Sequence, residues 1–165
     1  MRCVFIGRFQ PFHKGHFYAL KKIAENCEDV FVIIGSADKG FTKDNPFTLA
    51  ERIKMVKMVA KESGIDVRIL PVADVQSDDL WLENILKKIK KIDVVFSNNG
   101  WVKKIFERAG YSVKNTGMYK RDVCEGTHIR KLMAEGKDWQ RYVPFPVAEY
   151  IKRIKGEERV KKLFE

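Results

Sequence analysis

Residues 7–16 read GRFQPFHKGH and lie between an apolar run at 2–6 and a series of apolar residues at helical spacing. This order predicts a strand that turns through glycine into a helix. Such a turn leaves backbone N–H groups pointing outward, and the helix N-terminus adds the positive end of a dipole. His13 and His16 lie at this corner, where imidazole can donate hydrogen bonds to phosphoryl oxygens or carry a positive charge beside them. We therefore expect a phosphate-binding corner and phosphoryl or nucleotidyl chemistry.

A second stretch, EGTHIR at 125–130, lies near the other end of the chain. Thr127 and Arg130 are three residues apart, so at the start of a helix they share one face. A hydroxyl, free N–H groups and a guanidinium fork can then grip one polyphosphate. His128 lies between them, and we interpret it as a structural residue.

Together the two stretches resemble the nucleotidyltransferase superfamily. Its HxGH signature matches 13–16, and its second phosphate-binding signature, SxTxxR, is similar to 125–130, where glutamate stands at the position of the serine. Three intervening stretches are similar to the archaeal nicotinamide-nucleotide adenylyltransferases: GSADKGFTKDNPFTLAER at 35–52, DLWLENI at 79–85 and FSNNGWVKKIFERAGYSV at 96–113. The resemblance implies transfer of the adenylyl group of ATP to nicotinamide mononucleotide (NMN), giving NAD and pyrophosphate. It also implies Mg²⁺ accompanying ATP without a dedicated set of protein ligands, and a homo-oligomer.

The resemblance assigns roles to individual residues. The catalytic residues are His13, His16 and Arg130. Trp81 stacks on the pyridine ring of NMN, and Asp74 and Asp78 bind its ribose or carboxamide. The residues that contact ATP are Gly7, Arg8, Phe9, Gly15 and Thr127.

Short apolar runs alternate with helical periods, which is typical of βαβ units and a parallel sheet. We expect a single α/β domain at 1–165 with a Rossmann-like nucleotidyltransferase fold: a five-stranded parallel sheet, helices on both faces and a small C-terminal helical region. The sheet core occupies about 1–115, and the phosphate-binding and C-terminal helices occupy about 116–165, before a charged tail. Thr48 and Glu51 form a capping box that opens a helix ending near Gly64. Strands are expected at 2–6, 29–35, 66–71, 92–97 and 111–114.

Composition limits the class of protein. The longest apolar runs are far shorter than the ~20 residues of a membrane span, and the first strand begins too early for a signal peptide, so we expect a cytoplasmic protein. The net charge of +10 requires nucleic acid to be considered as a partner. The basic residues are scattered along the chain, so we do not expect a nucleic-acid partner. The odd number and the spacing of Cys3, Cys27 and Cys124 predict three thiols and neither a disulfide framework nor a zinc site.

Three positions leave alternatives open. Trp81 precedes an apolar helical stripe by one residue, so we expect it to point roughly 100° away from the core face, although it can also widen that stripe. Asp78 occupies a position where archaeal relatives usually carry asparagine. Glu125 replaces the signature serine; it can repel the triphosphate, hold Mg²⁺, or, as we prefer, face solvent or pair with Arg121.

Two other functions remain as alternatives. Both signatures indicate the transferred nucleotide and not its acceptor. The nearest alternative is therefore adenylyl or cytidylyl transfer to phosphopantetheine or flavin mononucleotide. The other is a non-catalytic nucleotide- or RNA-binding protein, suggested by the net charge and by Glu125. Trp81 favours NMN.

Overall fold

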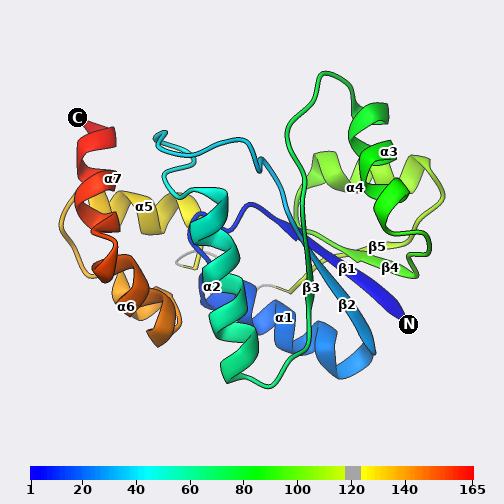
Figure 1. The fold of residues 1–165 in the computed structure, drawn as a ribbon, viewed down its shortest axis with the longest axis horizontal. Coiled ribbons are helices and arrows are strands. Elements are labelled where there is room, and N and C mark those ends of the chain that lie inside the picture. Colours follow the sequence, from blue (N-terminus) through cyan, green and yellow to red (C-terminus); the bar gives the residue numbers. More distant parts are fainter. Residues whose placement is uncertain (118–123) are drawn as a thin grey trace.

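The computed structural model describes residues 1–117 and 124–165, and its centre is a parallel five-stranded sheet (Figure 1). The strand order is β3-β2-β1-β4-β5. Their bounds are β1 Arg2–Gly7, β2 Asp29–Ile34, β3 Arg68–Pro71, β4 Val94–Phe96 and β5 Val113–Lys114. The inner part of β1 is buried on both faces, as expected of the central strand of a parallel sheet. The predicted fold class and the five predicted strands are confirmed.

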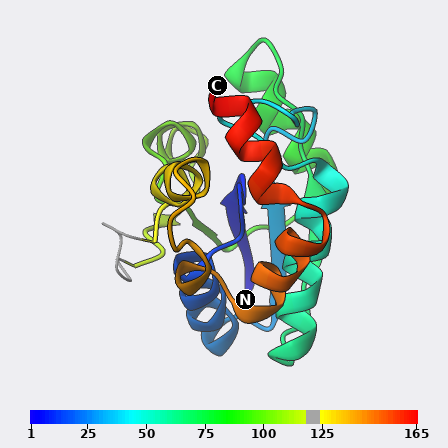
Figure 2. The same ribbon diagram turned by 90° about the vertical axis from the view of Figure 1, so that its left-hand side faces the viewer.

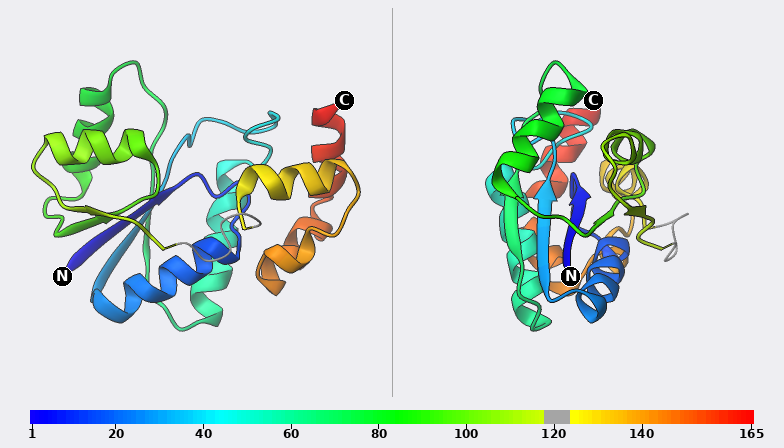
Figure 3. Two further views of the ribbon diagram at one scale, coloured as in Figure 1. Left: turned by 180° about the vertical axis from the view of Figure 1, so that it is seen from behind. Right: turned by 90° about the vertical axis from the view of Figure 1, so that its right-hand side faces the viewer.

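Helices cover both faces of this sheet (Figure 3). Helices α1 Lys14–Asn26 and α2 Leu49–Glu62 bury their apolar residues against one face, and α3 Asp78–Lys88 and α4 Gly100–Arg108 against the other. The chain runs from β1 outward to β3 and then returns to the opposite side of β1 to form β4. The strand order therefore reverses between β1 and β4, and ligands of open α/β sheets bind beyond the carboxyl ends of the strands at such a point.

The remaining helices form a group beside α2 (Figures 1 and 2), on the opposite side of the molecule from α3 and α4 (Figure 1). They are α5 Gly126–Ala134, the 3₁₀ turn η1 Gln140–Tyr142, α6 Phe145–Arg153 and α7 Gly156–Phe164. Helix α6 packs against α2, and α7 packs against α5. The expected charged tail is in fact α7. Two of its residues, Gly156 and Val160, are buried. Gly156 approaches α6 so closely that a Cβ would lie 2.8 Å from Ile151 Cγ2.

Local capping signals correctly place the start of α2. The Thr48 Oγ1 accepts from the Glu51 N–H, and the Glu51 carboxylate accepts from the Thr48 N–H, as the predicted capping box requires. The helix ends at Glu62, and Gly64 follows with a positive φ of 68°. None of the helices in the described part of the chain has the length and apolar composition needed to cross a membrane.

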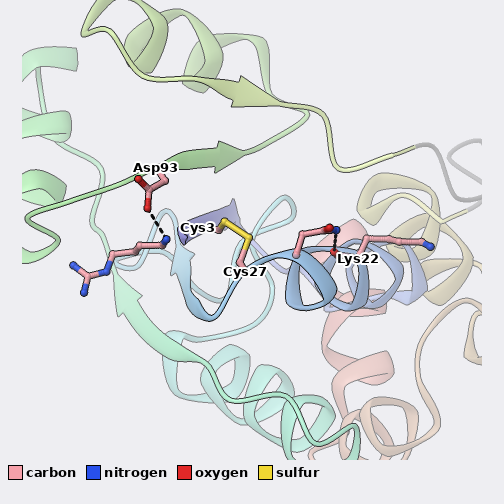
Figure 4. Close-up of a disulfide and its surroundings, with 6 residues drawn as sticks. Cys3, Lys22, Cys27 and Asp93 are labelled. Carbon is pink, nitrogen blue, oxygen red and sulfur yellow. Dashed lines mark hydrogen bonds between the residues drawn. A yellow bond between two sulfur atoms is a disulfide. The ribbon is translucent and has the colours of Figure 1, made fainter.

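The prediction of three thiols is wrong for two of the cysteines, because Cys3 and Cys27 form a disulfide (Figure 4). Cys3 lies near the start of β1, and Cys27 follows the last residue of α1. The β1–α1 unit folds back on itself and brings their Cα atoms to 6.0 Å, a separation that suits a disulfide. Cysteine number and spacing cannot reveal this proximity. Cys124 is buried and takes no part in the disulfide.

Candidate active site

The corner between β1 and α1 is built from two histidines that cap the helix together. His13 is the N-cap residue of α1; its Nδ1 accepts from the His16 N–H at 3.3 Å, and the His16 Nδ1 accepts from the His13 N–H at 3.1 Å. The two rings stack with centroids 3.6 Å apart. Because each Nδ1 accepts a hydrogen bond from a backbone N–H, neither Nδ1 carries a proton, so each neutral ring carries its proton on Nε2. Both histidines are therefore Nε2–H donors.

The electrostatic surroundings favour the neutral form of both rings. Burial, reinforced by the Arg130 charge, lowers the pKa of His13 to about 3. Burial, with His13 as a further cause, lowers the pKa of His16 well below its ordinary value. Of the two roles expected from the sequence, hydrogen-bond donor or cation, this environment favours the donor.

Gly15 allows this stacked arrangement to form. A Cβ on Gly15 would lie 2.9 Å from the His13 Cε1 and 3.2 Å from the Cys124 carbonyl oxygen, so any larger residue would displace the ring or the chain that enters α5. Phe9 packs beneath the pair, buried, with its ring edge-on to His16 at 4.6 Å. Its side chain therefore supports the histidines from the core.

Helix α5 brings the second predicted stretch to the same corner. The Arg130 Nη1 donates to the Gln10 carbonyl at 2.8 Å, and its Nη2 donates to the Thr127 Oγ1 at 3.3 Å. The guanidinium is nearly buried, and burial together with the charge of Arg8 lowers the pKa of Arg130. Arg8 itself is exposed. Two arginines on one side of the histidines make this corner strongly attractive to an anion.

A third arginine, Arg52 in α2, was not predicted from the sequence. It is completely buried, and its guanidinium donates to the carbonyls of Arg8 and Gly35 through Nη1, at 3.0 and 2.9 Å. Its Nη2 donates to the Ser36 and Lys39 carbonyls, and its Nε to the Thr48 carbonyl. It thereby joins the ends of β1 and β2 to the start of α2. A charged residue four positions after the cap and four before Val56, on the buried face of α2, was the available signal.

Three adjoining clefts meet at this corner. The phosphate cleft, of about 200 Å³, is lined by Arg8, Phe9, Gln10, His13, His16, Glu125, Gly126, Thr127 and Arg130. The loop cleft, of about 220 Å³, is lined by His13, Gly15, His16, Asn98, Thr116, Gly117, Cys124 and Glu125. The tryptophan cleft, of about 260 Å³, is lined by Ile6, Gly7, Arg8, Gly35, Ser36, Asp74, Trp81, Ser97, Asn99, Trp101 and Val102. The histidines belong to the first two, and Arg8 links the first to the third.

The residues predicted to bind NMN separate into two groups. Trp81 and Asp74 line the tryptophan cleft, where the Asp74 carboxylate accepts from the Ser36 hydroxyl at 3.0 Å. We expected Trp81 to point away from the core face, and this is wrong. Trp81 is 3% exposed and packs among the apolar residues of α3 and α4, because the helix turns this position toward the sheet. Asp78 does not line the cleft. Its carboxylate accepts from the Trp101 Nε1 at 2.9 Å.

Glu125 is the N-cap residue of α5, and its side chain makes no capping hydrogen bond. It is exposed and lines both the phosphate cleft and the loop cleft. The preferred pairing partner, Arg121, lies outside the described residues. No group of three or more His, Cys, Asp or Glu side chains within 1–117 and 124–165 is arranged to hold a metal ion.

Comparison with known proteins identifies the family to which the chain belongs. Residues 4–155 match the family model described as cytidylyltransferase-like, so the chain belongs to that family. The nicotinamide-nucleotide adenylyltransferase of Archaeoglobus fulgidus is 40% identical, over 98% of this chain and 96% of that protein. The protein of the same name from Methanolobus tindarius is also 40% identical, over 97% and 92%. Within the family, the chain thus groups with the nicotinamide-nucleotide adenylyltransferases.

A solved structure shares the fold along almost the whole chain. It is that of a bifunctional NMN adenylyltransferase/ADP ribose pyrophosphatase from Francisella tularensis, complexed with AMP and a manganese ion, with a TM-score of 0.79 and 25% identity. The match covers 98% of this chain and 51% of that one, so the present chain spans about half the length of that protein.

Proposed function

We propose that this protein transfers the adenylyl group of ATP to NMN, giving NAD and pyrophosphate. The observation that carries the proposal is the arrangement of the clefts around Arg8. This residue lines both the phosphate cleft, which contains the second signature, and the tryptophan cleft, which offers indole surface for a pyridine ring. A triphosphate in the phosphate cleft and a mononucleotide in the tryptophan cleft would bring their phosphates together at the guanidinium of Arg8. The names of the archaeal relatives support this choice of substrates.

The reaction needs no protein nucleophile. A phosphate oxygen of NMN attacks the α-phosphorus of ATP, a new P–O bond forms, and the bond between the α-phosphorus and the bridging oxygen breaks, releasing pyrophosphate. The attacking group is already an anion, so positioning and charge stabilisation supply the rate. In this assignment the Nε2–H groups of His13 and His16 donate to the phosphates as charge develops. Arg130 and Thr127 hold the departing pyrophosphate.

Magnesium enters this scheme bound to ATP. Glu125 is the one carboxylate among the described residues that line the phosphate cleft, so the phosphates and water would supply most of the ligands. The ion would neutralise phosphate charge. The chain itself contributes the two arginines and the paired histidines.

The experiment is an assay of pyrophosphate release from ATP with a panel of acceptors. NMN and its deamidated form are compared with flavin mononucleotide and phosphopantetheine, and an RNA-binding titration is run in parallel. We expect release that depends on ATP, Mg²⁺ and a pyridine mononucleotide. Release with flavin mononucleotide or phosphopantetheine alone would establish the alternative acceptor. Tight nucleotide binding without release would establish a non-catalytic binding protein.

A further inference from the structure

Trp101 differs from the other two tryptophans in its exposure. Trp81 and Trp139 are 3% and 0% exposed, whereas Trp101 is 45% exposed. Trp101 is the second residue of α4 and lines the tryptophan cleft. Indole is among the most costly side chains to leave in water, since it carries a large apolar surface. A half-exposed indole on the wall of a cleft therefore indicates a surface that a ligand covers.

Hydrogen bonds hold both the indole ring and the backbone of Trp101. Its Nε1 donates to the Asp78 Oδ1 at 2.9 Å, across from α3 to α4. Its backbone N–H donates at 2.9 Å to the side chain of Asn99, which caps α4. The Arg108 guanidinium lies 3.7 Å from the other oxygen of Asp78. The orientation of the ring is thus fixed before any ligand arrives.

Trp81 and Trp101 form an angled aromatic wall. Their ring centroids are 4.7 Å apart and their planes are inclined by 54°. Trp81 lies at the base, and Trp101 extends toward solvent. The cleft between this wall and the strand ends also contains the polar groups of Asp74 and Asn99. A flat aromatic ring with a polar substituent fits such a surface.

We propose that Trp101 is a substrate-binding residue whose exposed indole face covers the pyridine ring of the mononucleotide, and that Asp78 is a positioning residue that acts through Trp101. This inference rests on the proposed function. The pyridine ring of NMN carries a positive charge, and an indole face attracts cations. Asp78 then contributes through the orientation of the indole, and the carboxamide is recognised by other groups.

The first test is a fluorescence titration together with steady-state kinetics. Addition of NMN should quench the tryptophan emission of the wild-type protein, and Trp101→Phe should lose most of that quenching. Trp101→Ala should raise the KM for NMN about 5–150-fold, the range that base–aromatic stacking supplies, while the KM for ATP stays within twofold. The matched control is Phe145→Ala, which removes another exposed aromatic ring, 76% exposed on α6, and should change neither constant.

The second test separates positioning from direct contact. Asp78→Asn keeps an acceptor for the Trp101 Nε1 and should retain the wild-type KM for NMN, whereas Asp78→Ala should raise it. In the Trp101→Ala background, Asp78→Ala should have no further effect, because the side chain that it orients is already gone. Additive effects of the two substitutions would overturn the role assigned to Asp78.

The remaining outcomes distinguish this inference from the proposed function. If wild-type protein forms NAD from NMN, and Trp101→Ala leaves both the quenching and the KM for NMN unchanged, the assignment of Trp101 is overturned and the function stands. If wild-type protein neither releases pyrophosphate with NMN nor shows quenching by NMN, the proposed function itself fails. Circular dichroism of each variant shows that it is folded.

Discussion

The phosphate corner and the tryptophan cleft adjoin each other but are built in different ways. At the corner, His13 and His16 bond to each other's backbone, and Arg130 is held by Gln10 and Thr127. In the cleft, polar atoms orient Trp101 from behind, and the face that it presents is bare indole. Under the proposed function, the group that is transferred would meet a fixed set of donors, and the acceptor would meet an apolar surface. This explains why the two signatures identify the nucleotide chemistry but do not identify the acceptor.

The largest effect on stability is expected at Arg52, which joins the strand ends at the corner to the start of α2. Arg52→Met removes five hydrogen bonds from the buried guanidinium to backbone carbonyl oxygens and should lower the free energy of unfolding by about 3–5 kcal/mol, as expected when a buried charged network loses one partner. Urea denaturation measures the change. Lys57→Met, an exposed substitution in the same helix, is the control and should stay within about 0.5 kcal/mol. A loss below about 1 kcal/mol for Arg52→Met would show that the loops hold together without it.

Removal of His16, one of the two donors to which the proposed function gives a catalytic role, should have a large effect on rate. His16→Ala should lower kcat by roughly 10²–10³-fold with a smaller change in the KM for ATP, the size expected when one preorganised donor is lost. The control is His128→Ala, which removes the histidine that packs edge-on to Tyr142 and should leave kcat within twofold. Near-normal turnover in a folded His16→Ala protein would contradict the assignment of His16 as a catalytic donor.

Acid should weaken the corner before it affects the cleft. The pKa of His13 and that of His16 are lower in the folded protein than the 6.5 of an unperturbed histidine, so below pH 6.5 the unfolded chain binds protons that the folded protein excludes. Stability is therefore full above this pH and falls as the pH approaches the folded pKa, by up to about 1.4 kcal/mol per pH unit for each histidine.

Urea denaturation between pH 7 and 5 measures this slope. His16→Gln should flatten it, whereas Trp101→Phe should keep the wild-type slope, because Trp101 does not titrate. Equal slopes in wild-type and His16→Gln proteins would mean that His16 is not held neutral by the fold.

The smallest effect is expected at Glu125, on the rim between the phosphate and loop clefts. Since its carboxylate is exposed, Glu125→Ser should change the KM for ATP and the Mg²⁺ concentration at half-maximal rate by less than about threefold, under ~0.7 kcal/mol. Paired titrations of ATP and Mg²⁺ measure both. A larger fall in the KM for ATP would reveal repulsion of the triphosphate, and a larger rise in the Mg²⁺ requirement would reveal a metal ligand.

Sequence patterns predicted the features that depend on neighbouring residues. The strand after Met1, the capping box at Thr48 and the helix that begins at EGTHIR are local, and each is present. The patterns also predicted that both signatures converge, because the carboxyl ends of parallel strands lie at one edge of the sheet.

The missed features depend on tertiary packing. The disulfide joins residues 24 positions apart, and Arg52 bonds to a carbonyl 44 positions away. Trp81 faces the sheet because of how α3 docks, and Asp78 reaches Trp101 because α3 and α4 lie side by side. Spacing along the chain could mark Arg52 as a charged residue on a buried helix face, but it could not name the partners in these contacts.

The most direct test is ¹⁵N NMR of the imidazole nitrogens of His13 and His16, with His16→Gln used for assignment. The reciprocal cap predicts that both rings in the free protein are neutral between pH 5 and 8, each with the proton on Nε2 and an unprotonated Nδ1. The signals of His128 serve as an internal reference. A proton on Nδ1 of either ring, or an imidazolium at pH 6, would contradict the account of the corner as a fixed pair of neutral donors.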